Sequence, residues 1–485
     1  MTNRTYEPSS FRDKSGTVFY ENNQVYRQVN KSYKKEYDFL MDSGLWYALE
    51  AHNLIIPHEE VDSIPKNEDV YKIIKPTKIP FISYPYEWSF SQLKDAGLVT
   101  LEIQKMALEY GMTLKDASAY NIQMVDGYVL IDTLSFEIYE EGQPWKAYKQ
   151  FCQHFLAPLA LMSHQDVRLN SLSRIFMDGI PLDLASKLLP FKTKTMLTLL
   201  THIHAHAKWQ KKHEDGQDVD LKKKKLSKRS LMGIIETLYS GIRKLNWTPK
   251  GTEWAEYYGK TNYSTQSFER KKEIISRYID SIKPTGVWDL GANTGIFSRI
   301  ASEKGIPTIA FDIDPAAVEK NYLEYAQYEK NIFPLVLDLT NPSPDIGWAN
   351  QERLSILNRG PVDTIMALAL IHHLAISNNV PIPKIVDFLA SLCNNLIIEF
   401  VPKEDSQVRR LLSTREDVFD DYDEDNFVRE FGKKFEIVES DKIPDTERTV
   451  YCMRNKIDRI KFDRFFEAHE KLKDEGAELS VSKLD

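Results

Sequence analysis

Short apolar runs of strand length alternate with helical patterns in the second half of the chain, from about residue 252 onward. Such alternation predicts a parallel sheet with helices on both of its faces. No helical pattern separates the last two runs, which predicts that these two strands pair antiparallel. The expected strands are Val287–Leu290, Thr308–Phe311, Phe333–Leu337, Thr364–Leu368, Leu396–Phe400, Phe435–Val438 and Val450–Met453.

The first half of the chain is rich in strands at its start and helical afterwards. Residues 17–30 predict a β-hairpin, because aromatic and β-branched residues flank a polar Glu-Asn-Asn turn. Residues 145–205 have a helical pattern that is interrupted by Pro181 and Pro190. Between these regions we expect a helix at 34–51, strands at Val70–Ile74 and Phe81–Pro85, a helix at 91–110, and strands at Ile122–Met124 and Tyr128–Ile131 around the turn Asp126-Gly127.

A charged stretch after about residue 205 separates the two halves. Its low apolar content is typical of a solvated linker. A chain of 485 residues with 42% apolar residues is long enough for two or three domains. We therefore expect an N-terminal α+β domain at 1–205, a basic linker at 206–245, an α/β domain at 246–455, and a helix with a polar tail at 456–485.

Charge and cysteine content narrow the classes of function. The net charge of −8 gives no general attraction to polyanions, so nucleic acid would bind only through the basic patch 222–229, which more simply is solvated surface. Cys152, Cys393 and Cys452 lack the spacing of metal ligands or of a disulfide framework. Neither a signal peptide nor a membrane-spanning run is found, so we expect a soluble, cytoplasmic protein. The oligomeric state cannot be predicted.

The clearest chemical signal is a glycine-rich turn after the first strand of the second half. The strand ends in Asp289, and the segment Leu-Gly-Ala-Asn-Thr-Gly295 leads into a helix. In open α/β sheets such a turn lies at the carboxyl edge, where ligands bind. Gly291 lets the backbone approach a ligand closely, and Asp289 can accept hydrogen bonds from an ammonium group. The turn alone is shared with NAD-binding domains and nucleotide hydrolases.

Acidic residues at the next two strand ends narrow the ligand further. Asp312, at the tip of the second strand, can hold both hydroxyls of a ribose. Asp338, after the third strand, can accept a hydrogen bond from an adenine amino group. Three acidic strand ends in succession suit a cationic, ribose-bearing ligand and would repel a pyrophosphate.

With these residues in place, the region 246–455 resembles the class I methyltransferases that depend on S-adenosylmethionine (SAM). The resemblance implies a Rossmann-like, doubly wound sheet of seven strands with an antiparallel last strand, and SAM as the cofactor. The cofactor-binding residues that it implies are Asp289, Gly291 and Gly295 for the methionine part, with Asn293 in the same loop, Asp312 for the ribose and Asp338 for adenine.

Methyl transfer requires alignment of donor and acceptor, plus a base where the acceptor carries a proton. His372 and His373 follow the fourth strand and are the candidate bases, although such pairs are also commonly structural. Glu399 ends the fifth strand and is expected to line the acceptor side as a catalytic candidate. Tyr263 lies in an aromatic segment that is expected near the sulfonium, or else in the core. The acceptor, a polar group on a saccharide, phosphate, small molecule or protein, is not identified.

In the first half, Asp116, Asn121 and Asp132 have the spacing found in protein kinases and small-molecule phosphotransferases, which this half resembles. The resemblance implies a kinase-like domain in which Asp116 is the base, Asn121 and Asp132 are ligands of Mg²⁺, and ATP is bound. No glycine-rich phosphate loop occurs near residues 15–30, and Arg27 stands where the phosphate-pairing lysine is expected. Alternatively, Asp116 and Asn121 only satisfy the backbone of a turn.

These patterns together favour a methyltransferase whose kinase-like domain selects or presents the acceptor. The arrangement also resembles bacterial methyltransferases associated with nodulation and with the modification of surface saccharides. Two alternatives remain: a bifunctional kinase and methyltransferase, and a non-catalytic regulatory protein that binds SAM.

Overall fold

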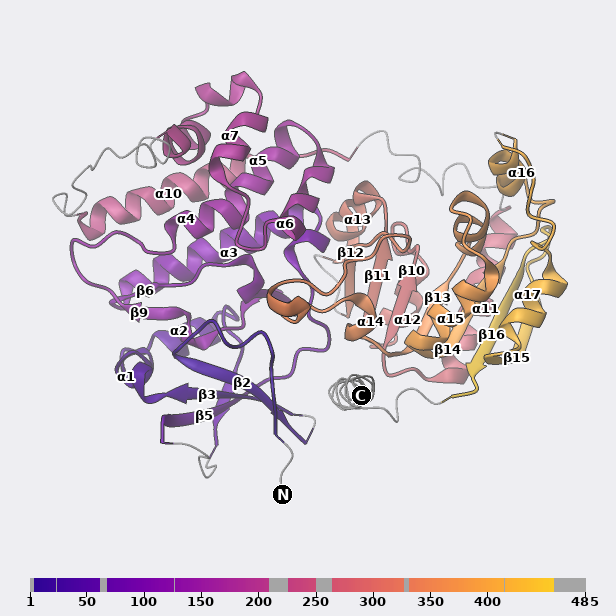
Figure 1. The fold of residues 1–485 in the computed structure, drawn as a ribbon, viewed down its shortest axis with the longest axis horizontal. Helices are drawn as coiled ribbons and strands as arrows, with labels where there is room; N and C mark the ends of the chain where they lie inside the picture. The colour runs from indigo at the N-terminus through magenta and orange to yellow at the C-terminus, as the bar shows by residue number, and fades with distance from the viewer. Residues whose placement is uncertain are drawn as a thin grey trace, which may run out of the picture. The chain divides into compact units, whose positions relative to one another are not determined.

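A computed structural model describes residues 4–22, 24–61, 68–125, 127–208, 226–249, 264–326, 331–413 and 415–457 of the chain. The chain forms two compact units, residues 1–249 and residues 250–485, each of which is described by itself (Figure 1). Predictions for Tyr263, for residues 222–225 of the basic patch and for the tail 458–485 lie outside the described residues.

The first unit starts with a five-stranded sheet in the order β1-β2-β3-β5-β4. The predicted hairpin is confirmed, because β2 and β3 pair antiparallel from Gly16 with Val29 to Glu21 with Gln24. Two smaller sheets, β6 with β9 and β7 with β8, follow later in the chain. The strands are β1 (Thr5–Tyr6), β2 (Gly16–Glu21), β3 (Gln24–Asn30), β4 (His58–Glu60), β5 (Val70–Pro76), β6 (Met112–Leu114), β7 (Ile122–Val125), β8 (Gly127–Leu130) and β9 (Phe136–Ile138).

The long helix α3, which was predicted from its apolar spacing, contacts α2, α5 and α10. Ser89 and Gln92 form a capping box at its start, and Leu93, Leu101 and Leu108 are fully buried on it. The helices are α1 (Lys34–Asp42), α2 (Leu45–Ala51), α3 (Phe90–Glu109), α4 (Tyr148–Phe151), α5 (Ala157–His164), α6 (Leu172–Ile175), α7 (Leu182–Leu188), α8 (Leu197–Leu199) and α10 (Lys228–Lys244).

Two predictions for the first unit are wrong in part. The expected helix at 34–51 is divided into α1 and α2 at Gly44, whose φ of 83° no regular helix allows. The expected strand at Phe81–Pro85 does not form. There the Gln123 side chain takes the place of a partner strand: its Oε1 accepts from the Ser83 amide at 3.0 Å, and its Nε2 donates to the Ser83 carbonyl at 2.9 Å.

The structure also places α10 inside the stretch that was expected to be a linker. Ser227 caps this helix, and its hydroxyl accepts a hydrogen bond from the Ser230 amide at 3.2 Å. Leu231, Ile235 and Leu238 on one face are buried, and Tyr239 donates to Glu102 of α3 at 3.1 Å. Residues 228–244 thus form an amphipathic helix of the first unit rather than a solvated connection.

The second unit contains one seven-stranded sheet in the order β12-β11-β10-β13-β14-β16-β15. Neighbouring strands are parallel except that β16 runs antiparallel to both β14 and β15. The predicted seven strands and the antiparallel last strand are confirmed. The strands are β10 (Val287–Leu290), β11 (Thr308–Asp312), β12 (Ile332–Val336), β13 (Val362–Ala367), β14 (Cys393–Phe400), β15 (Phe435–Lys442) and β16 (Thr449–Asn455).

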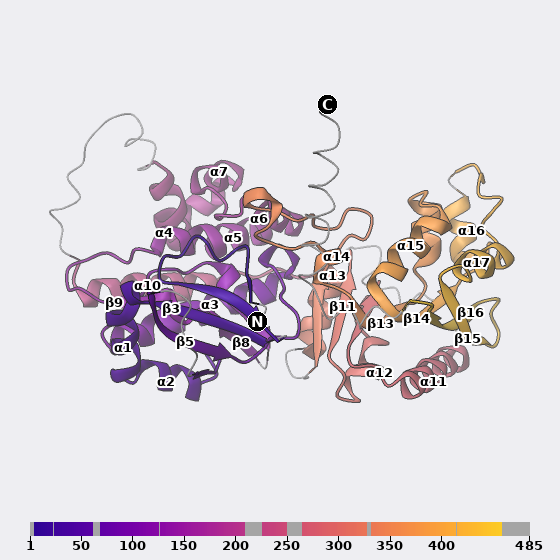
Figure 2. The ribbon, with the colours of Figure 1, turned by 60° about the horizontal axis from the view of Figure 1, so that its bottom comes forward.

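Helices cover both faces of this sheet (Figure 2). On one face, Ile275 and Tyr278 of α11 pack with Phe297 against Met366 of β13. On the other face, α15 contacts β13 and β14. The helices of this unit are α11 (Thr265–Ile282), α12 (Ser298–Ser302), α13 (Pro315–Asn321), α14 (Ile356–Arg359), α15 (Ile382–Leu392), α16 (Ser406–Leu412) and α17 (Glu424–Phe431).

Two general properties bear on the predictions above. Cys152, Cys393 and Cys452 are all buried and free. In the part of the chain that the structure describes, no helix has the length and apolar character needed to cross a membrane.

Candidate active site

The loop after β10 is built around two glycines with positive φ. Gly291 and Gly295 both have φ of 77°, a region that residues with side chains rarely adopt. A Cβ added at Gly291 would lie 3.3 Å from the Leu370 side chain, and one added at Gly295 would lie 2.5 Å from Asn321 Nδ2. The Gly291 amide also donates to the carbonyl of Phe311 in β11 at 2.9 Å. Conformation and space therefore both require the two predicted glycines.

Asp289 is a buried residue of β10 that precedes this loop. Its side chain is 2% exposed, and its Oδ2 accepts a hydrogen bond from Ser298 Oγ at 2.6 Å. Burial raises the pKa of Asp289 to about 7, against the opposing effects of the Ser298 hydroxyl and the Lys271 ammonium. A carboxylate buried in this way favours a ligand that brings positive charge.

Asp312 ends β11 and faces the same loop. Its Oδ2 accepts a hydrogen bond from the Asn293 amide at 2.7 Å, and its Oδ1 accepts one from the Asp314 amide at 2.8 Å. Asn293 has φ of 52°, which asparagine tolerates better than most residues. Burial raises the pKa of Asp312 to about 6. The structure thus brings Asp312 and Asn293 together with the glycine loop.

Asp338 follows β12 at the same edge of the sheet. The Leu337 amide donates to the Asp312 carbonyl at 2.9 Å, which keeps the two acidic strand ends near each other. Asp338 is half-buried, and its Oδ1 accepts hydrogen bonds from the Thr340 amide at 2.8 Å and the Thr340 hydroxyl at 2.6 Å. The order of acidic residues along the edge is therefore the one predicted.

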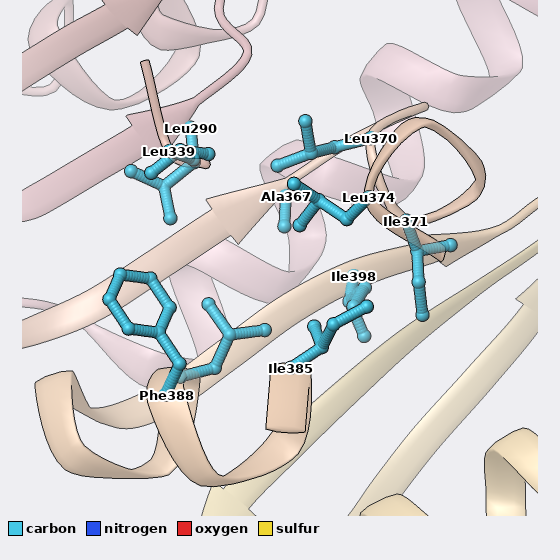
Figure 3. Close-up of a pocket in the computed structure, with 10 residues that line it drawn as sticks. Leu290, Leu339, Ala367, Leu370, Ile371, Leu374, Ile385, Phe388 and Ile398 are labelled. Carbon is cyan, nitrogen blue, oxygen red and sulfur yellow. The ribbon is translucent and has the colours of Figure 1, made fainter. Parts of the chain in front are cut away.

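An apolar pocket lies beside Leu339, the residue that follows Asp338 (Figure 3). In the view of Figure 3, Leu290 and Leu339 border it from above and Phe388 of α15 borders it from below. Its lining is entirely aliphatic or aromatic and consists of Leu290, Leu339, Ala367, Leu370, Ile371, Leu374, Ile385, Phe388, Leu389 and Ile398. This lining offers only apolar contacts, and it lies between the sheet and α15.

His372 and His373 lie at the start of the helical segment that follows β13, with ring centroids 4.1 Å apart. His372 is 1% exposed, and neither of its ring nitrogens has a hydrogen-bond partner among the described residues. Burial lowers the pKa of His372 well below its usual value and that of His373 to about 4, and the Arg448 cation contributes in both cases. Both imidazoles are neutral at pH 7, the form that can accept a proton.

Glu399, at the end of β14, is completely buried within a set of charged side chains. Its Oε2 accepts hydrogen bonds from Lys271 Nζ at 2.6 Å and from the Ala369 amide at 2.8 Å. Its Oε1 lies 3.3 Å from Arg448 Nη1, and Arg448 also binds Asp405 with contacts of 2.8 and 3.1 Å. Both oxygens of Glu399 are therefore engaged within the protein.

In the first unit, the structure brings Asp116, Asn121 and Asp132 together. Burial, and then the nearby Asp132 carboxylate, raise the pKa of Asp116, while the Asn121 side chain opposes the shift through a hydrogen bond. The Ile131 amide donates to the Asn121 carbonyl at 2.8 Å. Asp116 also makes the turn contact that was given as the alternative, because its Oδ1 accepts a hydrogen bond from the Ser118 amide at 2.9 Å.

Cations already neutralise part of this cluster. Arg27 Nη2 lies 2.8 Å from Asp132 Oδ1, and Asp13 is 3.6 Å from both Arg27 Nη2 and Lys115 Nζ. Lys115 Nζ also donates to Ser15 Oγ at 2.6 Å. Among the described residues, no group of three or more His, Cys, Asp or Glu side chains is arranged to hold a metal ion.

Sequence reasoning missed Lys271 and Arg448. A signal for Lys271 was available, because it lies on the apolar face of α11, three, four and seven residues before Ile274, Ile275 and Tyr278. A lysine inside an apolar stripe needs a buried partner. For Arg448 no local pattern gives such a signal.

No protein-family model matches the chain. The chain is 35% identical over 453 residues to nodulation protein NoeA of Rhizobium meliloti strain 1021, and the match covers 91% of this chain and 94% of that protein. The chain belongs to the NoeA family. Because nearly the whole length is shared, this membership applies to both units.

Three solved structures are similar to about two fifths of the NoeA-family chain. Magnesium protoporphyrin IX methyltransferase (ChlM) of Synechocystis PCC 6803 with bound SAH is 17% identical, with 41% of this chain and 91% of that chain covered and a TM-score of 0.30. N-methyltransferase NodS of Bradyrhizobium japonicum WM9 is 12% identical, with coverages of 40% and 98% and a TM-score of 0.29. WbdD with the kinase inhibitor LY294002 is 15% identical, with coverages of 41% and 43% and a TM-score of 0.28. These likenesses are weak, so the function proposed below rests on the chain's own geometry.

Proposed function

We propose that the domain predicted at residues 246–455 binds SAM and transfers its methyl group to a polar acceptor. The observation that carries this proposal is the pair of buried carboxylates, Asp289 and Asp312, on adjacent parallel strands beside the glycine loop. Burial raises the pKa of both groups, so they favour a ligand that brings a cation and hydrogen-bond donors. SAM carries an ammonium, a sulfonium and two ribose hydroxyls, whereas a pyrophosphate would be repelled.

The order of groups along the sheet edge supports this assignment. Asp289 would accept from the amino group of SAM, the backbone of the loop from Gly291 to Gly295 would lie beside its methionine chain, and Asp312 would accept from the ribose hydroxyls. Asp338 would accept from the adenine amino group, and the apolar pocket beside it offers a wall for the ring. Tyr263, outside the described residues, is retained as a proposed contact to the sulfonium.

Bound SAM supplies an electrophilic methyl carbon, and the protein's task is to align the acceptor with it. His372 and His373 follow β13 and are neutral at pH 7, because burial lowers the pKa of both. They are the proposed acceptors of a proton from the methylated group. Because burial and the nearby cations disfavour the protonated imidazole, either side chain would hold that proton only briefly. The acceptor is a saccharide, a phosphate, a small molecule or a protein.

Two measurements test this function together. Titration calorimetry with S-adenosylhomocysteine should show binding that Asp312→Ala weakens by at least about thirtyfold, and label from methyl-labelled SAM should enter one fraction of a cell extract. Binding without transfer to any fraction would favour the non-catalytic regulatory protein. The absence of binding to the wild-type chain would refute the assignment of the site.

For the first unit, we propose a kinase-like domain that selects or presents the acceptor. The support is that Asp116 and Asn121, before the β7–β8 hairpin, come near Asp132, after it, in the segment that follows the long helix α3. If Mg²⁺ and ATP bind here, Asn121 and Asp132 would hold the metal and Arg27 is placed for a phosphate. A bifunctional kinase and methyltransferase is the alternative, in which Asp116 would act as the base.

Thermal unfolding with ATP and Mg²⁺ tests the nucleotide site. A ligand at about 100 times its dissociation constant adds roughly 2.7 kcal/mol to the stability of the protein that binds it. Wild type should be stabilised and Asp132→Ala should not. Equal shifts of the melting temperature in the two proteins would contradict nucleotide binding at Asp132. Loss of ATP hydrolysis in Asp116→Ala would favour the bifunctional enzyme.

A further inference from the structure

A buried network of four charged side chains crosses the second unit. Lys271 and Glu399 are 2% and 0% exposed and Arg448 is 2% exposed, while Asp405 at 9% completes the set. Their formal charges cancel. A buried ion pair of this kind is on average no more stabilising than apolar side chains of the same size. The function of the network is therefore to be sought in what it holds in place.

The network holds the turn that follows β13. Glu399 Oε2 accepts a hydrogen bond from the Ala369 amide at 2.8 Å, and Ala369 has a φ of 50°. A residue with a side chain stays in this left-handed region only when its surroundings hold it there. Lys271, 2.6 Å from the same oxygen, fixes the carboxylate that does so. His372 and His373 come three and four residues after Ala369.

The same network contacts both sides of the proposed methyl-transfer site. On the donor side, Leu370, next to Ala369, lies against Gly291 of the glycine loop, and the Lys271 ammonium acts on the pKa of Asp289. On the acceptor side, Arg448 binds Asp405, and Asp405 Oδ1 accepts the Gln407 amide at 2.8 Å at the start of α16.

We propose that Lys271 and Glu399 are positioning residues for methyl transfer, which hold the turn at Ala369 and through it Leu370 beside the glycine loop and the His372–His373 pair that follows. This inference rests on the proposed function of the site. It assigns to Glu399 a role other than that of a base, because both of its oxygens are bound within the protein.

Two double variants separate positioning from general stability. Lys271→Met with Glu399→Gln removes both charges but leaves a carbonyl oxygen that can accept the Ala369 amide. Lys271→Met with Glu399→Leu removes the same charges, fills a similar volume and leaves no acceptor. We expect the Leu pair to transfer label from SAM to the acceptor-containing extract at least tenfold more slowly than the Gln pair. The affinities of the two pairs for S-adenosylhomocysteine should agree within about threefold, because both pairs carry Lys271→Met and both retain Asp289 and Asp312.

Hydrogen exchange of the segment 368–373 gives a second readout that does not depend on the acceptor. Amides of this segment should exchange at least tenfold faster in the Leu pair than in the Gln pair, whereas β11 should exchange equally in both. Equal exchange, or transfer rates that follow only the melting temperatures, would overturn the positioning role. If wild type binds no S-adenosylhomocysteine, the proposed function fails, while the exchange comparison still decides whether Glu399 holds the turn. Glu399→Met replaces Glu399→Leu if the latter does not fold.

Discussion

Acidification from pH 8 to pH 6 should weaken the binding of S-adenosylhomocysteine through Asp289. This carboxyl is 2% exposed, and burial raises its pKa to about 7. The ligand carries the same ammonium group as SAM, and the ammonium favours the ionised carboxylate. At pH 6, binding therefore has to remove a proton from Asp289, and part of the binding free energy is spent on that step.

The magnitude follows from the fraction of Asp289 that is ionised. With a pKa of about 7, this fraction falls about tenfold between pH 8 and pH 6, which corresponds to ~1.4 kcal/mol. An ordinary aspartate, with a pKa of about 3.9, would contribute almost nothing over the same interval. Protonation of Asp312 lowers the affinity at pH 6 by at most about a further twofold, because burial raises the pKa of Asp312 to about 6. The lowered pKa values of His372 and His373 place both below this window.

The stability of the ligand-free protein should change in the opposite direction. The pKa of Asp289 is higher in the folded chain, at about 7, than in the unfolded chain. The stability that it contributes is therefore complete below the unfolded pKa and is lost as the pH rises through about 7. Between pH 6 and pH 8 the free protein becomes less stable, while the stabilisation by the ligand increases.

Calorimetric titrations at pH 6, 7 and 8, each in two buffers with different ionisation enthalpies, measure both the affinity and the number of protons released. We expect about half a proton to be released at pH 7, where Asp289 is about half ionised in the free protein. Asp289→Asn is the matched control; its affinity should be low and should change by no more than about twofold in this range, through Asp312. A flat pH profile for wild type, or an unchanged slope in Asp289→Asn, would refute the assignment of the ammonium to this carboxylate.

Three further changes test other parts of the structure. Gly295→Ala should lower the free energy of unfolding by about 2–4 kcal/mol in urea, from left-handed strain and a clash, whereas Gly305→Ala, with φ of 79° and open space around it, should cost only about 1–2 kcal/mol. Equal costs would contradict the close contact at Gly295. Asp312→Asn should weaken the binding of S-adenosylhomocysteine about thirtyfold by calorimetry, since hydrogen bonds to a charged group contribute about 2 kcal/mol. An unchanged affinity would show that Asp312 does not bind the ribose. Leu238→Ala in α10 should destabilise the first unit by about 2–5 kcal/mol. Ser240→Ala, at an exposed position of the same helix, should cost no more than about 0.5 kcal/mol. A small effect of Leu238→Ala would favour the prediction that these residues form a solvated linker.

The sequence was sufficient for the sheet of the second unit and for the order of acidic residues along its edge. Each strand is an apolar run, and Asp289 and Asp312 lie at the ends of two of them. Strand ends on a parallel sheet share one edge, so local patterns alone bring these carboxylates together. The roles of individual site residues remain proposals.

The parts that sequence reasoning missed depend on contacts between distant segments. Lys271 and Glu399 are 128 residues apart, and no local pattern states that a lysine of α11 meets a carboxylate at the end of β14. The helix α10 was concealed by the charged stretch before it, although Leu231, Ile235 and Leu238 have helical spacing. At Phe81–Pro85 an apolar run was taken for a strand, but the Gln123 side chain supplies its hydrogen bonds.

The acidic residues of the two proposed sites differ in their cationic neighbours. In the second unit, Asp289 and Asp312 are buried with raised pKa values, and the neighbouring cation, Lys271, is bound to Glu399 at 2.6 Å. Among the described residues, an entering cation therefore meets carboxylates that no ion pair neutralises, and binding requires only that Asp289 lose the proton it carries below about pH 7.

In the first unit, Asp132 already has a cation, because Arg27 Nη2 lies 2.8 Å from its carboxylate. A guanidinium does not lose its proton in proteins, so a metal ion alone would have to displace Arg27 against repulsion. A phosphate group would instead draw Arg27 and Lys115 toward itself, as the Asp13 carboxylate at 3.6 Å from each already does. Phosphate binding would thereby release Asp132 for a metal, so ATP and Mg²⁺ should bind cooperatively. It follows that a missing thermal shift with Mg²⁺ alone does not count against a nucleotide site, whereas a missing shift with both ligands does.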